Sequence, residues 1–214
     1  MSETTEKKRP PDMTMPRPLG KREQTKATNR EAILAAASGV FAELGYGATT
    51  VRDIIRITGL ASGTFYNYFK SKEEVFEALM DDSARRLRPR LRAERSHSRN
   101  FPDYLRNAIR AYFEFLAEDR GAYAVMRRNT GALRVRMDTP EVVAGFEEIR
   151  SYIEEDIANG RLPNVDAEYL TAAAVGAAME VGDRLIMRDE PDIEAVTEFT
   201  VNLLLNGILA LPSK

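Results

Sequence analysis

The segment between residues 28 and 80 constrains the fold most, because its apolar residues recur every three or four positions and turn residues separate the runs. The first run ends at Gly45 and Gly47, which favour helix termination. A shorter run follows Thr50, and the turn "TGLAS" separates it from a third run, in which Phe65 and Phe69 share one face. The pattern predicts three successive helices in an all-α fold.

Three hydroxyl residues in this segment each precede an acidic residue by three positions, which is the pattern of a capping box. The pairs are Thr28 with Glu31, Thr50 with Asp53, and Ser71 with Glu74. Helices are therefore expected to begin just after residues 28, 50 and 71.

A helix followed by two short helices with a glycine-containing turn between them is the layout of a helix-turn-helix. If Phe65 and Phe69 face the core, several polar and tyrosine side chains of the same segment point away from it. They are Ser62, Thr64, Tyr66, Asn67 and Tyr68. Small hydroxyl and amide groups on an exposed helix can reach base edges, and tyrosine hydroxyls can reach phosphates. The segment indicates DNA binding, although Thr64 could only cap the helix and Tyr68 could belong to the core.

The charge is distributed unevenly along the chain. Up to Lys72, 12 Lys and Arg residues stand against 7 acids, an excess of +5, and from Glu73 onward 19 stand against 26, an excess of −7. A basic first third on an acidic body suggests that the first third meets a polyanion. Residues 1–27 are polar, basic and Pro-rich, and we expect a disordered tail. Its Lys21, Arg22 and Lys26 could add phosphate or minor-groove contacts, or the tail could be a solvated arm.

The segment from Arg30 to Leu79 also contains two specific patterns. They are Phe-x-x-x-Gly-Tyr-x-x-Thr-Thr and Ile-x-x-x-x-Gly-Leu-x-x-Gly-Thr-Phe-Tyr-x-Tyr-Phe-x-x-Lys. On these residues the chain resembles the TetR family of one-component transcriptional regulators. The resemblance implies a DNA-binding head at residues 28–72 and a helical ligand-binding and dimerisation body at residues 73–214.

The same resemblance implies DNA contacts at individual positions. Residues that would face the major groove are Ser62, Gly63, Thr64 and Asn67. Residues that would contact backbone phosphates are Tyr66, Tyr68 and Lys72, together with Thr49 and Thr50 at the start of the second helix. The alternative for Lys72 is a solvated charge.

The body contains five further helical patterns. The first continues from Ser71, and Pro89 is expected to kink or end it, because proline lacks the backbone donor. Its arginine-rich end, "RRLRPRLRAERSHSR", is interpreted as a solvated face. The second pattern starts at "FPDYL". The third is expected to have Thr139 as its N-cap and to end at Gly160. The last two are "DAEYLTAAAVGAAMEVGDRLIM" and "DIEAVTEFTVNLLLNGIL".

In the family, the last two helices pair with their copies, so the resemblance implies a homodimer. The interface candidates are Val175, Ala178, Met179, Leu203 and Leu204, which could instead form a core within one chain. The ligand-pocket candidates are Tyr112, Tyr123, Met126, Arg127, Asn129, Phe146, Tyr152, Met179 and Asp183, and these could also be ordinary core residues. Aromatic and Met side chains suggest an apolar ligand, and an inward arginine suggests an anionic head, as in a fatty acid or an acyl thioester.

Other classes of protein fit the sequence poorly. Without cysteine there is no disulfide scaffold or thiolate metal site, and the single histidine, His97, lies in a polar stretch. Neither a phosphate-binding glycine loop nor a His and Cys cluster with metal-ligand spacing occurs. We therefore do not expect the protein to be an enzyme or to bind a cofactor or a metal ion. No apolar run reaches the roughly 18 residues of a membrane span, and we expect a cytoplasmic protein without membrane contact.

The function expected from the sequence is a repressor. It would bind a palindromic double-stranded DNA operator as a homodimer and leave it when a small apolar or amphipathic effector binds. The alternative is a small-molecule binding protein of the same fold that has lost sequence-specific DNA binding.

Overall fold

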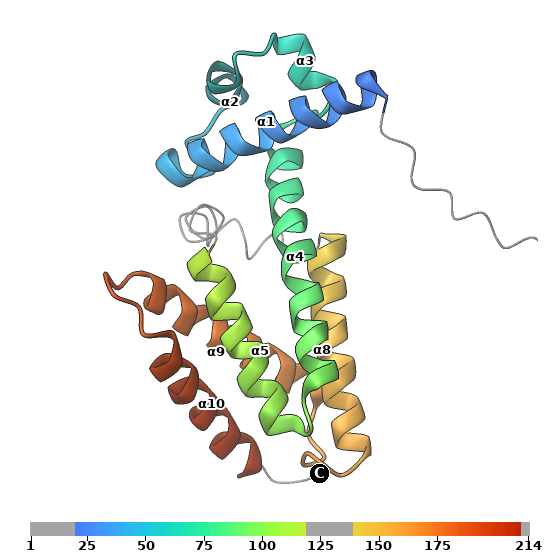
Figure 1. Ribbon diagram of the computed structural model, residues 1–214, viewed down its shortest axis with the longest axis vertical. Helices are drawn as coiled ribbons and strands as arrows, with labels where there is room; N and C mark the ends of the chain where they lie inside the picture. The colour runs from blue at the N-terminus through green and yellow to red at the C-terminus, as the bar shows by residue number, and fades with distance from the viewer. Residues whose placement is uncertain (1–19, 119–138, 211–214) are drawn as a thin grey trace, which may run out of the picture.

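The computed structural model describes residues 20–118 and 139–210 of the 214-residue chain. All regular structure within these ranges is α-helical, which confirms the predicted fold class (Figure 1). The helices are α1 (Lys21–Leu44), α2 (Val51–Thr58), α3 (Ser62–Tyr66), α4 (Lys72–His97), α5 (Phe101–Glu118), α8 (Pro140–Ala158), α9 (Ala167–Ile186) and α10 (Ile193–Leu209).

Helices α1, α2 and α3 and the first turns of α4 form one unit, here called the head, at the top of Figure 1. Its core is built from large side chains with no solvent exposure, among them Phe41, Ile54, Phe65 and Phe76. The Phe41 and Phe76 rings meet edge to face with centroids 5.4 Å apart, a favourable aromatic geometry. Phe69 is also buried, as its shared face with Phe65 predicted.

Helix α1 begins earlier than expected. The predicted N-cap Thr28 lies inside α1, which starts at Lys21 behind the N-cap Gly20, so the predicted start was wrong. The residues before Thr28 are mostly Lys, Arg, Glu, Gln and Ala, which favour helix even without apolar periodicity. The backbone N–H of Gly20 donates to the Glu23 carboxylate at 3.2 Å, which satisfies one donor at the helix start.

The other two predicted helix starts are confirmed. The Thr50 hydroxyl accepts a hydrogen bond from the backbone N–H of Asp53, and the Ser71 hydroxyl accepts one from that of Glu74. Between α2 and α3, Gly59 adopts a left-handed conformation with φ of 66°, which other residues rarely adopt. These local signals fix the turn that separates the two short helices.

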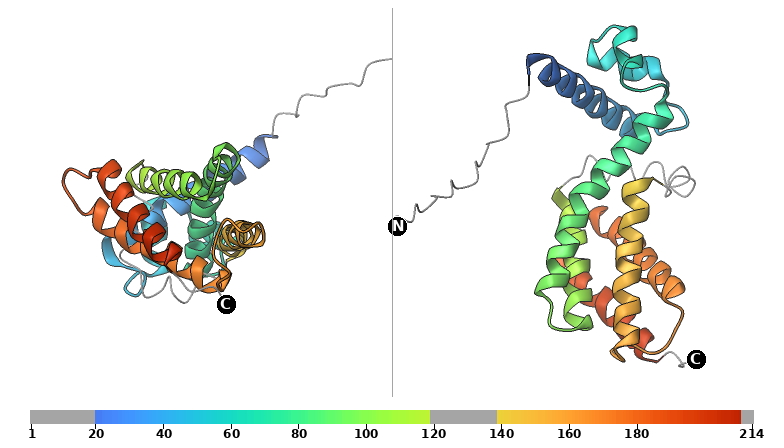
Figure 2. Two further views of the ribbon diagram at one scale, coloured as in Figure 1. Left: turned by 90° about the horizontal axis from the view of Figure 1, so that it is seen from below. Right: turned by 90° about the vertical axis from the view of Figure 1, so that its right-hand side faces the viewer.

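Helix α4 leaves the head and continues into the body, so a single helix belongs to both units (Figures 1 and 2). The prediction that Pro89 could end it was wrong, because α4 passes through Pro89 and ends at His97. Along the body α4 packs between α5 and α8, and these contacts hold the helix across the missing backbone donor.

Helices α5, α8, α9 and α10 complete the body around a second core. Phe113, Leu185 and Val201 are among its most deeply buried side chains. In the described ranges, no helix is both long and apolar enough to cross a membrane. The same residues contain no group of three or more His, Asp or Glu side chains that could hold a metal ion.

Gly182 marks the closest approach of α9 to α5. A Cβ atom at this position would lie 2.7 Å from Leu116 Cδ1 and 3.2 Å from Phe113 Cε1. We expect Gly182→Ala to lower the free energy of unfolding by about 1–3 kcal/mol, because the Leu116 and Phe113 side chains have to shift within a packed core. Gly39→Ala is the control, since nothing lies within 4 Å of that position and alanine favours a helix interior by about 0.5–1 kcal/mol. Urea denaturation of both variants tests this, and a Gly182→Ala protein as stable as the wild type would contradict it.

Candidate DNA-binding head and ligand cavity

Of the six predicted DNA contacts on or next to α3, four are exposed. The exposed ones are Ser62, Gly63, Tyr66 and Asn67. On the opposite side of α3, Phe65 has no solvent exposure and anchors the helix in the head. Thr64 and Tyr68 are half-buried, and Tyr68 packs against the head core. Short polar groups on an exposed helix with an anchored back are the geometry that a helix-turn-helix uses in the major groove.

The two threonines before α2 differ in their surroundings. Thr49 is 1% exposed, and its hydroxyl donates to the Gly45 carbonyl at 2.8 Å. Thr50 is exposed, and its hydroxyl donates to the Asp53 carboxylate at 2.6 Å. The hydrogen bonds from Thr50 lower the pKa of Asp53. At this helix start a phosphate would therefore reach the exposed Thr50 more readily than the buried Thr49. Both phosphate contacts stay predictions.

Lys72 takes part in the structure of the head. Its ammonium donates to the backbone carbonyls of Tyr46 at 2.7 Å and of Thr49 at 2.9 Å, and it lies 4.6 Å from the centre of the Tyr46 ring. The Tyr46 hydroxyl in turn donates to Glu73 at 2.7 Å. These bonds tie the start of α4 to the loop between α1 and α2. To contact a DNA phosphate as predicted, the Lys72 ammonium would have to give up one of these hydrogen bonds.

Asn67 offers the clearest test of base recognition. We expect Asn67→Ala to reduce the difference in affinity between operator and scrambled DNA by roughly 1–3 kcal/mol, the value of a bidentate contact to a base. Fluorescence anisotropy with both duplexes measures this difference. An equal loss of affinity for both sequences would instead place Asn67 on the phosphate backbone.

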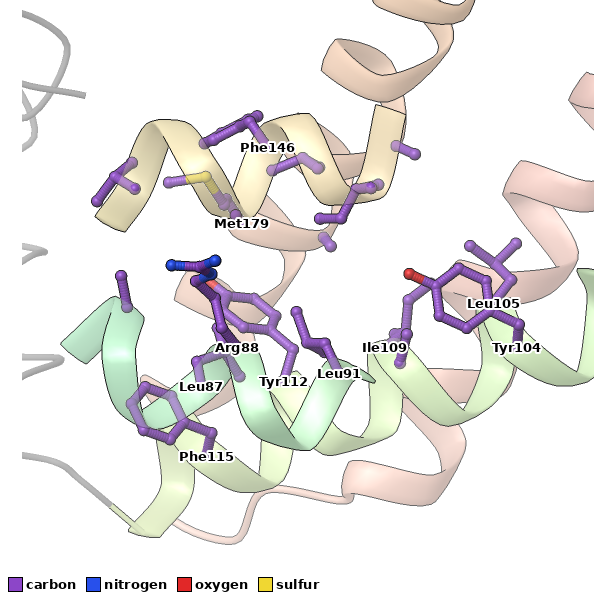
Figure 3. Close-up of a pocket in the computed structure, with 18 of the residues that line it drawn as sticks. Leu87, Arg88, Leu91, Tyr104, Leu105, Ile109, Tyr112, Phe115, Phe146 and Met179 are labelled. Atoms are coloured by element: carbon purple, nitrogen blue, oxygen red, sulfur yellow. The ribbon is translucent and has the colours of Figure 1, made fainter. Parts of the chain in front are cut away.

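The body contains an elongated cavity of about 230 Å³ between α4, α5, α8 and α9 (Figure 3). Phe101 and Leu116, near opposite ends of α5, both line it, so it extends roughly 22 Å along that helix. Its wall is almost entirely apolar, and the charged residues among those that line it are Arg88 and Glu141. A long, narrow, apolar space of this size fits one flexible chain better than a broad ring system.

The two ends of the cavity differ. Phe101, Ile153 and Leu170, at one end, are each less than a tenth exposed. At the other end the side chains of Arg88 and Glu141 are 17% and 30% exposed. The cavity therefore has an apolar end and an end that carries two charged, partly exposed side chains.

The structure separates the predicted pocket residues into three groups. Tyr112, Phe146 and Met179 line the cavity, whereas Tyr152 and Asp183 do not. The remaining candidates, Tyr123, Met126, Arg127 and Asn129, lie outside the described residues. Burial and the nearby charge of Asp183 raise the pKa of Tyr112, so its hydroxyl stays protonated at neutral pH.

The predicted interface residues also differ in position. Val175, Ala178 and Met179 line the cavity, and Leu204 packs against the body core. Leu203 is 56% exposed on α10, and Phe199, four residues earlier, is 61% exposed. Residues four apart share one face of a helix, so these two form an exposed apolar stripe.

Most arginines of α4 are exposed, as the sequence suggested, but Arg88 and Arg95 are only 17% and 18% exposed. Arg88 donates to both Glu141 and Glu148 of α8, and Arg92 donates to Glu148. The hydrogen bonds from Arg92 and then Arg88 outweigh the effect of burial and lower the pKa of Glu148 to about 2. The α4–α8 cluster consists of Arg88, Arg92, Glu141 and Glu148. It joins α4, which enters the head, to α8, which covers the cavity.

Glu148 should contribute to acid sensitivity. Its pKa is about 2 in the folded protein against a usual 4.5, so its stabilising effect is complete above about pH 4.5 and is lost as the pH falls towards 2. We expect Glu148→Gln to be less stable than the wild type at pH 7, with a shallower decline of stability between pH 4.5 and 2. Urea denaturation across that range measures both. An unchanged acid slope would contradict the assignment.

Comparison with known proteins assigns the head. Residues 33–79 match the family described as "Bacterial regulatory proteins, tetR family". Over 181 residues the chain is 27% identical to the fatty acid metabolism regulator protein of Bacillus subtilis (strain 168), covering 82% of this chain and 93% of that protein.

The body resembles solved structures as well. The fatty acid degradation regulator FadR from Bacillus halodurans superposes with a TM-score of 0.71 at 26% identity, covering 84% of this chain and 96% of FadR. FadR from Bacillus subtilis in complex with stearoyl-CoA superposes with a TM-score of 0.72 at 25% identity, covering 83% of this chain and 98% of that one. With the matched head and the exposed face of α3, these similarities identify the chain as a DNA-binding transcriptional regulator whose residues 33–79 match the tetR family.

Proposed function

We propose that the protein is a homodimeric repressor that binds a palindromic operator and is released from it by a long-chain acyl ligand. The observation that carries the proposal is the path of α4, which begins in the head and lines the apolar cavity of the body. A change in the cavity can therefore change the position of the head through one continuous helix.

The ligand class rests on the cavity and on the relatives. The cavity is long and apolar, and it carries Arg88 and Glu141 at one end. That arrangement suits a chain with a polar head. The similar regulators are named for fatty acid metabolism and degradation, and one is in complex with stearoyl-CoA. We infer that this chain binds a related acyl compound.

Dimerisation follows from the geometry of DNA. Two recognition helices that read successive major grooves have to lie about 34–36 Å apart, which requires two heads. The exposed stripe of Phe199 and Leu203 on α10 is a surface that a second copy can cover.

Release is a population shift between two body conformations. The acyl ligand binds better to the conformation in which α4 has moved away from α8 or α5 to admit it. The spacing of the two heads then no longer matches successive major grooves. The binding free energy for the operator weakens by the coupling free energy between the ligand site and the DNA-binding site. Along the body, the helices that pack against α4 are α5 and α8.

The test begins with selection of bound sequences from a random duplex pool, followed by titration of the recovered operator complex with myristoyl-CoA. We expect a palindrome with half-sites about one helical turn apart, or a pair of overlapping sites, and dissociation by the acyl compound. Binding of myristoyl-CoA by a folded dimer that enriches no sequence would instead support a binding protein that has lost operator recognition.

A further inference from the structure

One row of side chains runs along α1 and changes character where the head core ends. Its members stand three or four positions apart, so they share one face of the helix. They are Arg22, Lys26 and Arg30, followed by Ile33, Ala37 and Phe41. The last three have no solvent exposure, whereas the first three, called here the basic row, are exposed. The face of α1 that packs on the core in its second half is therefore basic in its first half.

The basic row lies on a part of α1 that overhangs the head. Figures 1 and 2 show the first turns of α1 projecting beyond α3. Arg30 marks the boundary, because its guanidinium lies 5.5 Å from the ring centre of Phe69, which follows α3 in the chain. From Arg22 to Arg30 the helix rises about 12 Å. The row therefore begins beside the head core, close to α3, and continues outward from it.

The charges of the basic row have no counterpart in the part of the chain that the structure describes. Within residues 20–118 and 139–210, no member of the row forms an ion pair. The acid of the first turn, Glu23, accepts from the backbone N–H of Gly20. A cation in the first turn also opposes the helix dipole, so the charge of Arg22 does not stabilise α1. An anion outside the described chain would compensate the row.

The anion that fits this position is the phosphate backbone of the duplex that α3 would read. Phosphates repeat along DNA, and 12 Å of its axis corresponds to about three or four base pairs. Contacts of Lys and Arg to phosphates position a protein and add affinity without reading bases. The row stands on an intact helix, which at about 10–12 Å across is too wide for a minor groove of about 6 Å. This excludes minor-groove readout by the row and leaves the backbone.

We propose that the basic row of α1 binds DNA phosphates beside the bases that α3 reads. The inference rests on the proposed operator binding and adds a surface to it. It also separates two lysines of the same helix. Lys21 and Lys26 are five positions apart, which places their side chains about 140° apart around α1, and only Lys26 belongs to the row. Lys26 then contributes to DNA affinity, and Lys21 does not.

The experiment uses the full chain and two matched variants, Lys26→Gln and Lys21→Gln, which remove the same charge from the same helix. Both positions are exposed, so neither change disturbs the head core. Fluorescence anisotropy gives the affinity for the operator and for scrambled DNA over a series of salt concentrations. We expect Lys26→Gln to reduce the slope of log K against log salt by about 0.9 for each head, or about 1.8 for a dimer. Both duplexes should lose affinity by a similar factor, and Lys21→Gln should keep the wild-type slope.

Ethylation of single phosphates in the operator locates the contact. Ethylation at the phosphates that Lys26 contacts should weaken binding of the wild type and of Lys21→Gln but not of Lys26→Gln. An unchanged salt slope or an unchanged ethylation pattern in Lys26→Gln would overturn the basic row and leave operator binding standing. An equal loss of slope in Lys21→Gln would also overturn it, because the effect would then not depend on the face of α1. Failure of the wild type to bind any duplex would overturn the repressor as well.

Discussion

Asp156→Ala is expected to destabilise the body by about 3 kcal/mol, because it removes the buried partner of two arginines. The Asp156 side chain is 1% exposed, and its Oδ1 accepts from Arg95 at 3.2 Å and from Arg161 Nε at 2.8 Å. Arg95 is only 18% exposed, and its guanidinium lies against the rings of both Tyr104 and Tyr152. Without the carboxylate, its charge remains partly buried and poorly compensated.

The neighbouring Glu155 provides a matched control for this prediction. It contacts the same two arginines, Arg95 at 3.2 Å and Arg161 at 3.5 Å, but its side chain is 56% exposed. Exposed ion pairs contribute roughly 0–1 kcal/mol, so Glu155→Ala should cost much less. Guanidinium denaturation measures both variants, and equal losses would show that burial does not decide the strength of this cluster.

Ala108→Phe is expected to abolish the response to acyl ligands while leaving operator binding intact. Ala108 lines the cavity from α5 and packs beside the body core. A phenyl ring there would occupy the space of the acyl chain, and forcing both into one site costs about 1–3 kcal/mol or more. The apparent affinity for myristoyl-CoA should fall by about 10–100-fold. Operator affinity without ligand should stay at the wild-type value.

The control for the cavity variant is Ala93→Phe. Ala93 is exposed on α4 and is not among the residues that line the cavity. This variant adds the same ring to the helix that joins the two units, and it should respond to myristoyl-CoA like the wild type. If the Ala108→Phe protein still dissociated from the operator at the myristoyl-CoA concentrations that release the wild type, the ligand would have to bind elsewhere.

The head could be predicted closely because its signals are local. The N-caps Thr50 and Ser71 and the buried pair of Phe65 and Phe69 each depend on residues three or four positions apart. The start of α1 was missed because strong helix formers extend a helix beyond its apolar pattern. Lys72 was predicted to contact a DNA phosphate. No local pattern shows that its ammonium also binds backbone carbonyls some 23–26 positions earlier in the chain.

The cavity was harder to predict because its wall comes from helices that are distant in sequence, from α4 to α10. Aromatic and Met residues at helical spacing look the same whether they line a cavity or fill a core, and Tyr112 and Tyr152 illustrate the two outcomes. An inward arginine was expected at Arg127, which lies outside the described residues. Among the described residues, the arginine that lines the cavity is Arg88, which lies within a run that resembles a solvated face. The acidic residues that pair with this run lie some 53–60 positions away on α8.

The central claim is that ligand in the body moves the heads, and the distance between the two heads of the dimer tests it most directly. The chain has no cysteine, so Ile57→Cys, at a position 63% exposed on α2, allows one spin label per head. Electron–electron double resonance would then compare the free dimer, the operator complex and the dimer with myristoyl-CoA. We predict that the acyl compound shifts the distance away from its value on the operator, in parallel with the loss of operator affinity. An unchanged distance with ligand bound would contradict the account.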